Sequence, residues 1–203
     1  MKEHPPIDFL FKNFIMKKIL IPAFLAFVFL IVSCNNKDEK TESTERTTDQ
    51  NTVKQDSNGV DNDASFATAV ADDGMLEVKL GQLAQTKGLS AKVKELGKMM
   101  ESDHSKAGEE LKTWAAKYNV SLPAALSQEK QDKYNDMEAK KGAQFDKAYA
   151  AAMVEDHEKA INDFQQEANG GKNAELKAWA AGKLPVLQHH LEMSKTTNVA
   201  VKK

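Results

Sequence analysis

Apolar residues in the larger, C-terminal part of this 203-residue chain recur every three or four positions. This spacing places them on one face of an α-helix, whereas strict alternation, which would predict a strand, is missing. Four long stretches share the pattern, and together they predict an all-α four-helix bundle. The apolar positions are Phe66, Val70, Leu76, Leu80, Leu83 and Ala84; then Val93, Leu96, Met100, Ala107, Leu111, Trp114 and Tyr118; then Phe145, Tyr149, Met153, Ala160 and Phe164; and finally Leu176, Trp179, Leu184, Leu187 and Leu191.

Capping residues predict where these helices begin and end. Asp63, Ser90 and Asn173 can each cap the start of a long helix, and Gly170-Gly171 ends the third stretch. A polar stretch from Ser127 to about Ala139 predicts a short extra helix between the second and third long helices. The longer connection around it is compatible with a ferritin-type crossover and with simple up-and-down order.

The N-terminal part resembles a bacterial export signal. Two lysines follow Met16, and fourteen apolar residues run from Ile19 to Val32, which is too short to span a bilayer comfortably. We interpret residues 16–33 as a lipoprotein signal peptide and residues 1–15 as an upstream over-call of the start.

The residue after this segment is Cys34, the only cysteine of the chain, and Ile-Val-Ser-Cys resembles a lipobox. We therefore expect a lipidated Cys34 that anchors the protein to the outer membrane, on the periplasmic or the cell-surface face. Residues 34–62 are almost devoid of apolar side chains, so we expect a flexible linker there. The bundle domain is then predicted over residues 63–203.

One phrase occurs twice in the helical stretches. The sequence "MESDHSKA" at 100–107 returns as "MVEDHEKA" at 153–160. In both copies the histidine, His104 or His157, follows a methionine by four positions and therefore lies on the apolar stripe. His190 has the same placement in the fourth stretch, and Glu77 in the first. Each predicted helix thus directs one polar side chain, able to bind a metal ion, at the core.

Three acidic residues accompany these four. Asp103 and Asp156 precede the repeated histidines and would face neighbouring helices, because adjacent helical residues diverge by about 100°. Glu101 lies three residues before His104, in the Glu-x-x-His spacing of di-iron proteins. The second such motif is missing, since Val154 occupies the acidic position before His157. A di-iron oxidase is therefore poorly supported.

The segments "GMLEVKLGQLA", "MESDHSKAGEELKTWAAK", "GAQFDKAYAAAMVEDHEKAINDF" and "LPVLQHHLEM" resemble the bacterial family known as domain of unknown function 4142 (DUF4142). The resemblance covers about residues 66–196. It implies a ferritin-like four-helix fold in an envelope protein, and it implies no established activity.

Two functions remain after this sequence comparison. We favour a non-enzymatic structural or interaction bundle, in which Asp and His side chains satisfy one another in a buried network. The alternative is a bundle that binds or sequesters one divalent transition metal (zinc, copper or iron) at Glu77, His104, His157 and His190, and that contributes to stress resistance.

Charge and motifs exclude several other classes. The net charge of −2 at pH 7 disfavours nucleic-acid binding. Neither a Gly-rich phosphate loop nor a nucleophile motif such as G-x-S-x-G occurs, so we expect no enzyme of those types. The sequence identifies the membrane as a partner through Cys34 but identifies no protein partner.

Overall fold

The computed structural model describes residues 57–203. The predictions for the signal peptide, Cys34 and most of the linker therefore lie outside the described residues. The described part is entirely helical, as predicted. It contains α1 (Ser57–Lys87), α2 (Ala91–Tyr118), α3 (Gln128–Ala139), α4 (Gly142–Gly170) and α5 (Ala174–Lys202).

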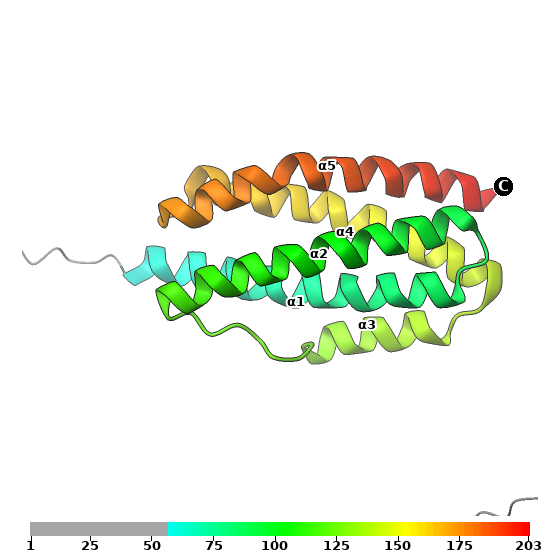
Figure 1. The fold of residues 1–203 in the computed structure, drawn as a ribbon, viewed down its shortest axis with the longest axis horizontal. Coiled ribbons are helices and arrows are strands. Elements are labelled where there is room, and N and C mark those ends of the chain that lie inside the picture. The colour runs from blue at the N-terminus through cyan, green and yellow to red at the C-terminus, as the bar shows by residue number, and fades with distance from the viewer. Residues whose placement is uncertain (1–56) are drawn as a thin grey trace, which may run out of the picture. The chain divides into compact units, whose positions relative to one another are not determined.

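The long helices form two antiparallel hairpins, α1 with α2 and α4 with α5 (Figure 1). Helix α3 follows the first hairpin in the chain and precedes the second, and it lies along α1 in the same direction. Lys130, near the start of α3, pairs with Asp73 in the middle of α1, and Lys87 at the end of α1 donates to the carbonyl of Glu138 at the end of α3. Helix α3 therefore brings the chain back to the end of the bundle at which α2 begins. As a result, α4 runs parallel to α2. This is the single crossover of ferritin-type bundles, which the sequence alone did not distinguish from up-and-down order.

Most of the predicted helix ends are confirmed. The Ser127 side chain accepts a hydrogen bond from the Lys130 amide, and the Asn173 side chain accepts from the amides of Glu175 and Leu176. These bonds satisfy amides that have no partner within the helix. Ser90 is the N-cap residue of α2, although its side chain makes no capping bond.

The prediction that Asp63 caps the first helix is wrong. Helix α1 begins at Ser57, ahead of Asp63. Extending an existing helix costs little compared with nucleating one, so polar residues can continue it. The Asp63 side chain is 3% exposed and makes tertiary bonds instead. Its carboxylate accepts the amide of Lys172 at 3.0 Å and the amide of Asn173 at 2.6 Å, both in the turn between α4 and α5.

Asp146 of α4 makes the reciprocal contact. Its buried carboxylate accepts the amides of Leu89 at 3.0 Å and Ser90 at 2.8 Å, in the turn between α1 and α2. Each hairpin therefore contributes one aspartate that binds the turn of the other hairpin. Together the two residues fasten both ends of the bundle.

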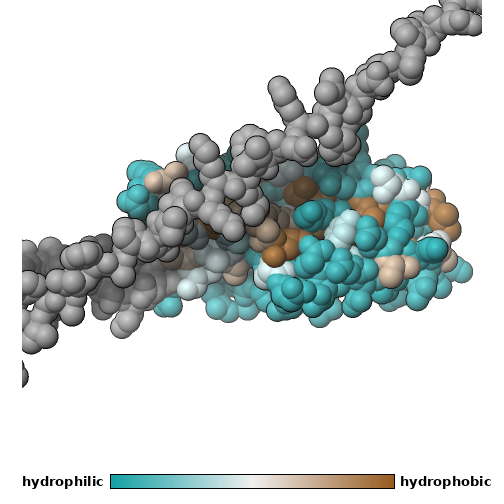
Figure 2. Space-filling model, turned by 90° about the horizontal axis from the view of Figure 1, so that it is seen from below, coloured by the Kyte–Doolittle hydropathy of each residue, from teal (hydrophilic) through white to brown (hydrophobic). Residues whose placement is uncertain are grey.

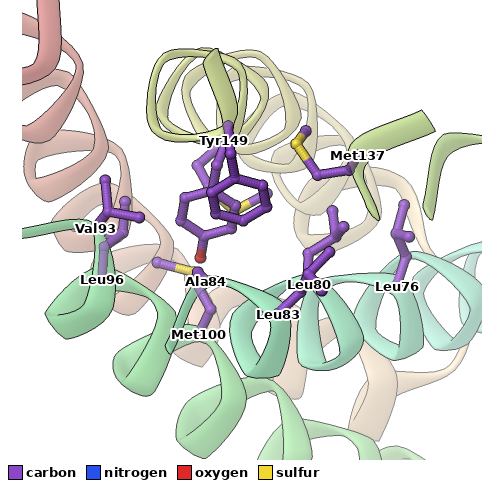
Figure 3. Close-up of a cluster of buried hydrophobic side chains, with 11 residues drawn as sticks. Leu76, Leu80, Leu83, Ala84, Val93, Leu96, Met100, Met137 and Tyr149 are labelled. Carbon is purple, nitrogen blue, oxygen red and sulfur yellow. The ribbon is translucent and has the colours of Figure 1, made fainter. Parts of the chain in front are cut away.

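The core is divided into an apolar cluster toward one end and two smaller clusters toward the other. The larger cluster packs Leu80, Leu96 and Met100 against Tyr149 and Met153 (Figure 3). The smaller clusters are built around Leu111 with Leu176 and around Phe164 with Leu187. The stripe positions between these clusters are occupied by the polar residues that the sequence analysis singled out.

The outside of the bundle is mainly hydrophilic on the face seen in Figure 2, where hydrophobic residues form only small patches. Within residues 57–203, no helix combines the length and the apolar character that a membrane crossing requires.

The two aspartates provide a test of this arrangement. We expect Asp63→Ala and Asp146→Ala each to lower the free energy of unfolding by on the order of 2–3 kcal/mol, because each leaves two backbone amides without a charged acceptor. Urea unfolding followed by circular dichroism measures the loss. Asp136→Ala, at an exposed position of α3, is the control and should leave stability nearly unchanged. Equal midpoints for all three variants would contradict the assigned role.

Candidate metal centre

Four helices each place one polar side chain in the middle of the bundle. Glu77 comes from α1, His104 from α2, His157 from α4 and His190 from α5. The two histidines of the second hairpin are fully buried, Glu77 is 6% exposed, and the His104 side chain is 12% exposed. The ring centroids of the three histidines lie 5.2 to 5.7 Å apart. The four side chains therefore meet in the interior of the bundle, as their positions on the apolar stripes predicted.

The orientation of His157 is fixed by a backbone carbonyl. Its Nδ1 lies 2.8 Å from the carbonyl oxygen of Met153, one turn earlier in α4. A carbonyl oxygen only accepts hydrogen bonds, so Nδ1 carries the proton and donates it. The other ring nitrogen, Nε2, is then left with a lone pair that points into the cluster.

His190 is oriented in the same manner by Asp103 of α2. Its Nε2 lies 2.9 Å from Oδ2 of Asp103, and the carboxylate accepts the hydrogen bond. In the neutral imidazole the lone pair is consequently on Nδ1, which faces the interior. The prediction that Asp103 reaches a histidine on a neighbouring helix agrees with this geometry.

His104 is oriented by Glu77. The Nδ1 atom of His104 lies 3.0 Å from Oε2 of Glu77 and donates to it. Burial disfavours the charged carboxylate, but the neighbouring histidines outweigh burial and hold the pKa of Glu77 at about 2. Its other oxygen, Oε1, lies 3.7 Å from Nδ1 of His157, which is too long for a hydrogen bond. The Nε2 atom of His104 is buried and has no hydrogen-bond partner among the described residues.

The three inner nitrogens approach one another closely. Nε2 of His157 lies 3.2 Å from Nδ1 of His190, and one ring nitrogen from each histidine lies within 4.8 Å of those from the other two. Because the outer nitrogens of His157 and His190 both donate, a 3.2 Å approach brings two lone pairs face to face. Such a contact is favourable only with a cation between the two atoms, either a proton or a metal ion.

A metal ion fits this spacing. At metal–nitrogen distances of 2.0–2.1 Å, tetrahedral coordination separates two ligand nitrogens by about 3.4 Å. The separation of 3.2 Å between the nitrogens of His157 and His190 is close to this value, and His104 offers a third ring nitrogen within 4.8 Å. Burial lowers the pKa of His157, and it lowers that of His190 to about 4. Both rings are therefore neutral at pH 7, which is the protonation state that binds metal.

His104 differs from the other two histidines. Burial acts to lower its pKa, but the charge and hydrogen bond of Glu77 outweigh burial, so that its pKa is raised. A proton on His104 would therefore compete with a metal ion for the same nitrogen.

Asp156 does not copy the role of Asp103, although both belong to the repeated phrase. Within the described range it forms no hydrogen bond to a histidine of the cluster. Burial and the charge of Glu77 raise its pKa to about 6, and Lys133 and Lys130 of α3 act in the opposite direction. The positive side chains that act on Asp156 are therefore lysines of α3.

Glu101 also lies apart from the predicted network. Its carboxylate accepts hydrogen bonds from the side-chain amides of Gln82 at 2.9 Å and Gln85 at 2.6 Å, both on α1. At this level α1 and α2 approach so closely that a Cβ atom on Gly81 would meet the backbone of α2. The close approach directs Glu101 to α1 and not to the histidines.

The cluster borders a cleft between the hairpins with a volume of ≈ 1150 Å³. Glu77, Asp103, His104 and His190 line it, whereas His157 does not. The Asp103 side chain is 42% exposed. Solvent and ions therefore reach the site past Asp103, while His157 forms its inner wall. The sequence analysis did not predict that the Met153 carbonyl orients His157, because a backbone hydrogen-bond acceptor has no signature in the sequence.

Comparison with known proteins gives two findings. In fold, the chain resembles a solved structure of CopM in the Cu(I)-bound form, with a TM-score of 0.57 and 16% sequence identity over 66% of this chain and 93% of that one. No match was found among curated proteins. The model of the family described as "Domain of unknown function (DUF4142)" matches residues 48–197, which is most of the sequence. The chain therefore belongs to the DUF4142 family.

Proposed function

We propose that this protein binds a single transition-metal ion through His104, His157 and His190, with Glu77 and Asp103 as positioning residues. The observation that carries the proposal is the direction of the three lone pairs. Glu77, Asp103 and the Met153 carbonyl each accept the outer N–H of one ring, which leaves the inner nitrogens directed at one another. Histidine ligands of metal ions are typically held by such outer acceptors.

This geometry favours the metal-binding alternative over the closed Asp-His network that we preferred from sequence. In a closed network every buried donor and acceptor has a complementary partner. Here Nε2 of His104 has no partner among the described residues, and the 3.2 Å contact between the other two rings lacks a donor when both are neutral. A bound ion supplies what each of these nitrogens lacks.

Copper is the ion that we propose first. Imidazole nitrogens are ligands for copper, zinc and iron alike, so the type of ligand alone does not identify the ion. The fold likeness to CopM, whose solved form contains Cu(I), favours copper as the starting point. Zinc is the second candidate, because three histidines are also a common zinc set.

We propose sequestration of the ion without catalysis. Glu77 and Asp103 both accept hydrogen bonds from imidazole rings, so neither carboxylate is available as a general base. The innermost ligand, His157, is fully buried. These features suit a protein that holds an ion in the cell envelope and thereby contributes to stress resistance.

Metal addition tests the proposal directly. An ion present at a hundredfold excess over its Kd should stabilise the purified full-length protein by about 3 kcal/mol. His104→Ala and His157→Ala should each abolish this gain, whereas His189→Ala should retain it because His189 is exposed and lies beside the cluster stripe. Thermal unfolding with Cu(I) under anaerobic reducing conditions, with Cu(II) and with Zn(II) measures the effect. Unchanged melting with all three ions would leave the closed network as the better explanation.

The positioning role of Glu77 can be tested separately. Glu77→Gln removes the charge that orients His104 while keeping the size of the side chain, so we expect metal affinity to fall roughly 10- to 100-fold. Glu101→Gln is the matched control on the adjacent helix and should bind metal as the parent protein does. Competition with a chromophoric chelator measures both affinities. If the two variants bind equally well, Glu77 does not position a ligand.

We also propose that the protein is anchored to the outer membrane through a lipid on Cys34, as the signal-like residues 16–33 and the Ile-Val-Ser-Cys flank support. Cys34→Ala should move the protein from the membrane fraction to the soluble fraction, because several acyl chains provide the anchoring energy. Fractionation and immunoblotting measure the distribution. Retention of the variant in membranes would contradict the anchor.

A further inference from the structure

A buried carboxylate without a hydrogen-bond partner lies at the far end of the bundle from the turn that Asp146 binds. Glu167, in the last turn of α4, is 7% exposed, and its Oε1 atom is buried and unpartnered among the described residues. Burial and the nearby charge of Asp63 raise its pKa to about 7, and Lys177 provides a smaller opposite effect. The ionised form of such a group is expensive to bury, so either a proton or a bound cation must compensate its charge.

The negative charge of Asp63 acts on Glu167 more strongly than the positive charge of Lys177 does, although the positive N-terminal end of α5 begins beside the same turn. Asp63 is itself 3% exposed, and its carboxylate is held in place by the amides of Lys172 and Asn173. The carbonyl end of α4 contributes the negative end of a helix dipole at the same place. Oε1 of Glu167 lies against Gly171, the residue next to the Lys172 amide that Asp63 binds, so the two carboxylates approach each other at this turn.

The equivalent turn of the first hairpin closes without a glutamate. There, Gly88 donates its amide to the carbonyl of Ala84 at 3.0 Å, just as Gly171 donates to the carbonyl of Glu167 at 2.9 Å. The first turn is thus closed with alanine at the position that Glu167 occupies in the second. A buried acid replaces a small apolar side chain at this one end.

The chain also leaves room for the Glu167 carboxylate. A Cβ atom on Gly171 would collide with Oε1 of Glu167, so glycine at this position lets the side chain fold over the turn. Both Asp63 and Glu167 line the cleft, together with Gly170, Gly171 and Lys172. The pair therefore borders the cleft, with Oε1 of Glu167 itself buried beneath the surface.

We propose that Glu167 and Asp63 form a second cation site, separate from the imidazole cluster, for a hard divalent ion of the class Mg²⁺, Ca²⁺ or Mn²⁺. Carboxylate oxygens are the ligands that these ions prefer, and one or two carboxylates with retained waters are a usual set for Mg²⁺. The bound ion supplies the positive charge that the buried pair lacks. It also joins α1 to the end of α4, and so adds to the contact between the two hairpins.

Thermal unfolding of the purified full-length protein tests this site. After treatment with a chelator, addition of MgCl2, CaCl2 or MnCl2 should raise the melting temperature in a saturable manner by several degrees. NaCl at matched ionic strength should not reproduce the rise. His157→Ala should retain it, because hard ions do not depend on imidazole ligands, so failure of this site and failure of the imidazole site are distinguishable.

Glu167→Gln is the decisive variant. It removes the buried charge and keeps the shape, so it should fold and melt at or above the parent protein in chelator, and its response to all three ions should be lost. Glu155→Gln, at an exposed position of the same helix, should respond as the parent protein does. A rise that persists in Glu167→Gln, or no rise with any of the three ions at millimolar concentration, would overturn the proposal.

Discussion

The reciprocal bonds of Asp63 and Asp146 are the constraint on which the rest of the structure depends. Each carboxylate crosses from one hairpin to two backbone amides in the turn of the other. Apolar side chains pack almost equally well when one hairpin is displaced along the other. A carboxylate bound to two amides, in contrast, allows only one position of the hairpins along the axis. With one such contact near each end, the two hairpins are held against sliding along their common axis.

The geometry of the candidate metal centre depends on that fixed position. Glu77 and His104 belong to the first hairpin, and His157 and His190 belong to the second. A slip of one helical turn between the hairpins would displace the two halves of the site by about 5.4 Å, which exceeds the 3.2 to 4.8 Å separations of the ligand nitrogens. The bond from Asp103 to His190 also crosses between the hairpins and fixes the site locally. The arrangement of the histidine cluster is therefore fixed by the fold itself.

Much of this arrangement could be predicted from the sequence, because it follows from helical periodicity. The stripe positions placed all four cluster residues in the interior, and the capping signal at Asn173 was correct. Features that depend on which helices become neighbours could not be predicted. Asp156 and Glu101 resemble Asp103 in sequence, yet lysines of α3 act on Asp156 and the close approach at Gly81 directs Glu101 to α1. The crossover itself has no local signature, since a connection of this length allows either order.

The charges of the site explain how such a polar cluster is tolerated inside the core. Glu77 is ionised and buried, and in the absence of metal the proton favoured on His104 balances it. When an ion binds, it takes the place of that proton, so a monovalent ion such as Cu(I) leaves the net charge of the buried site unchanged. A divalent ion adds one positive charge, which Asp103 at the solvent-exposed edge can offset only in part, because water screens it. On the proposed function, the single buried carboxylate therefore favours monovalent over divalent ions, a preference that three imidazole ligands alone would not provide.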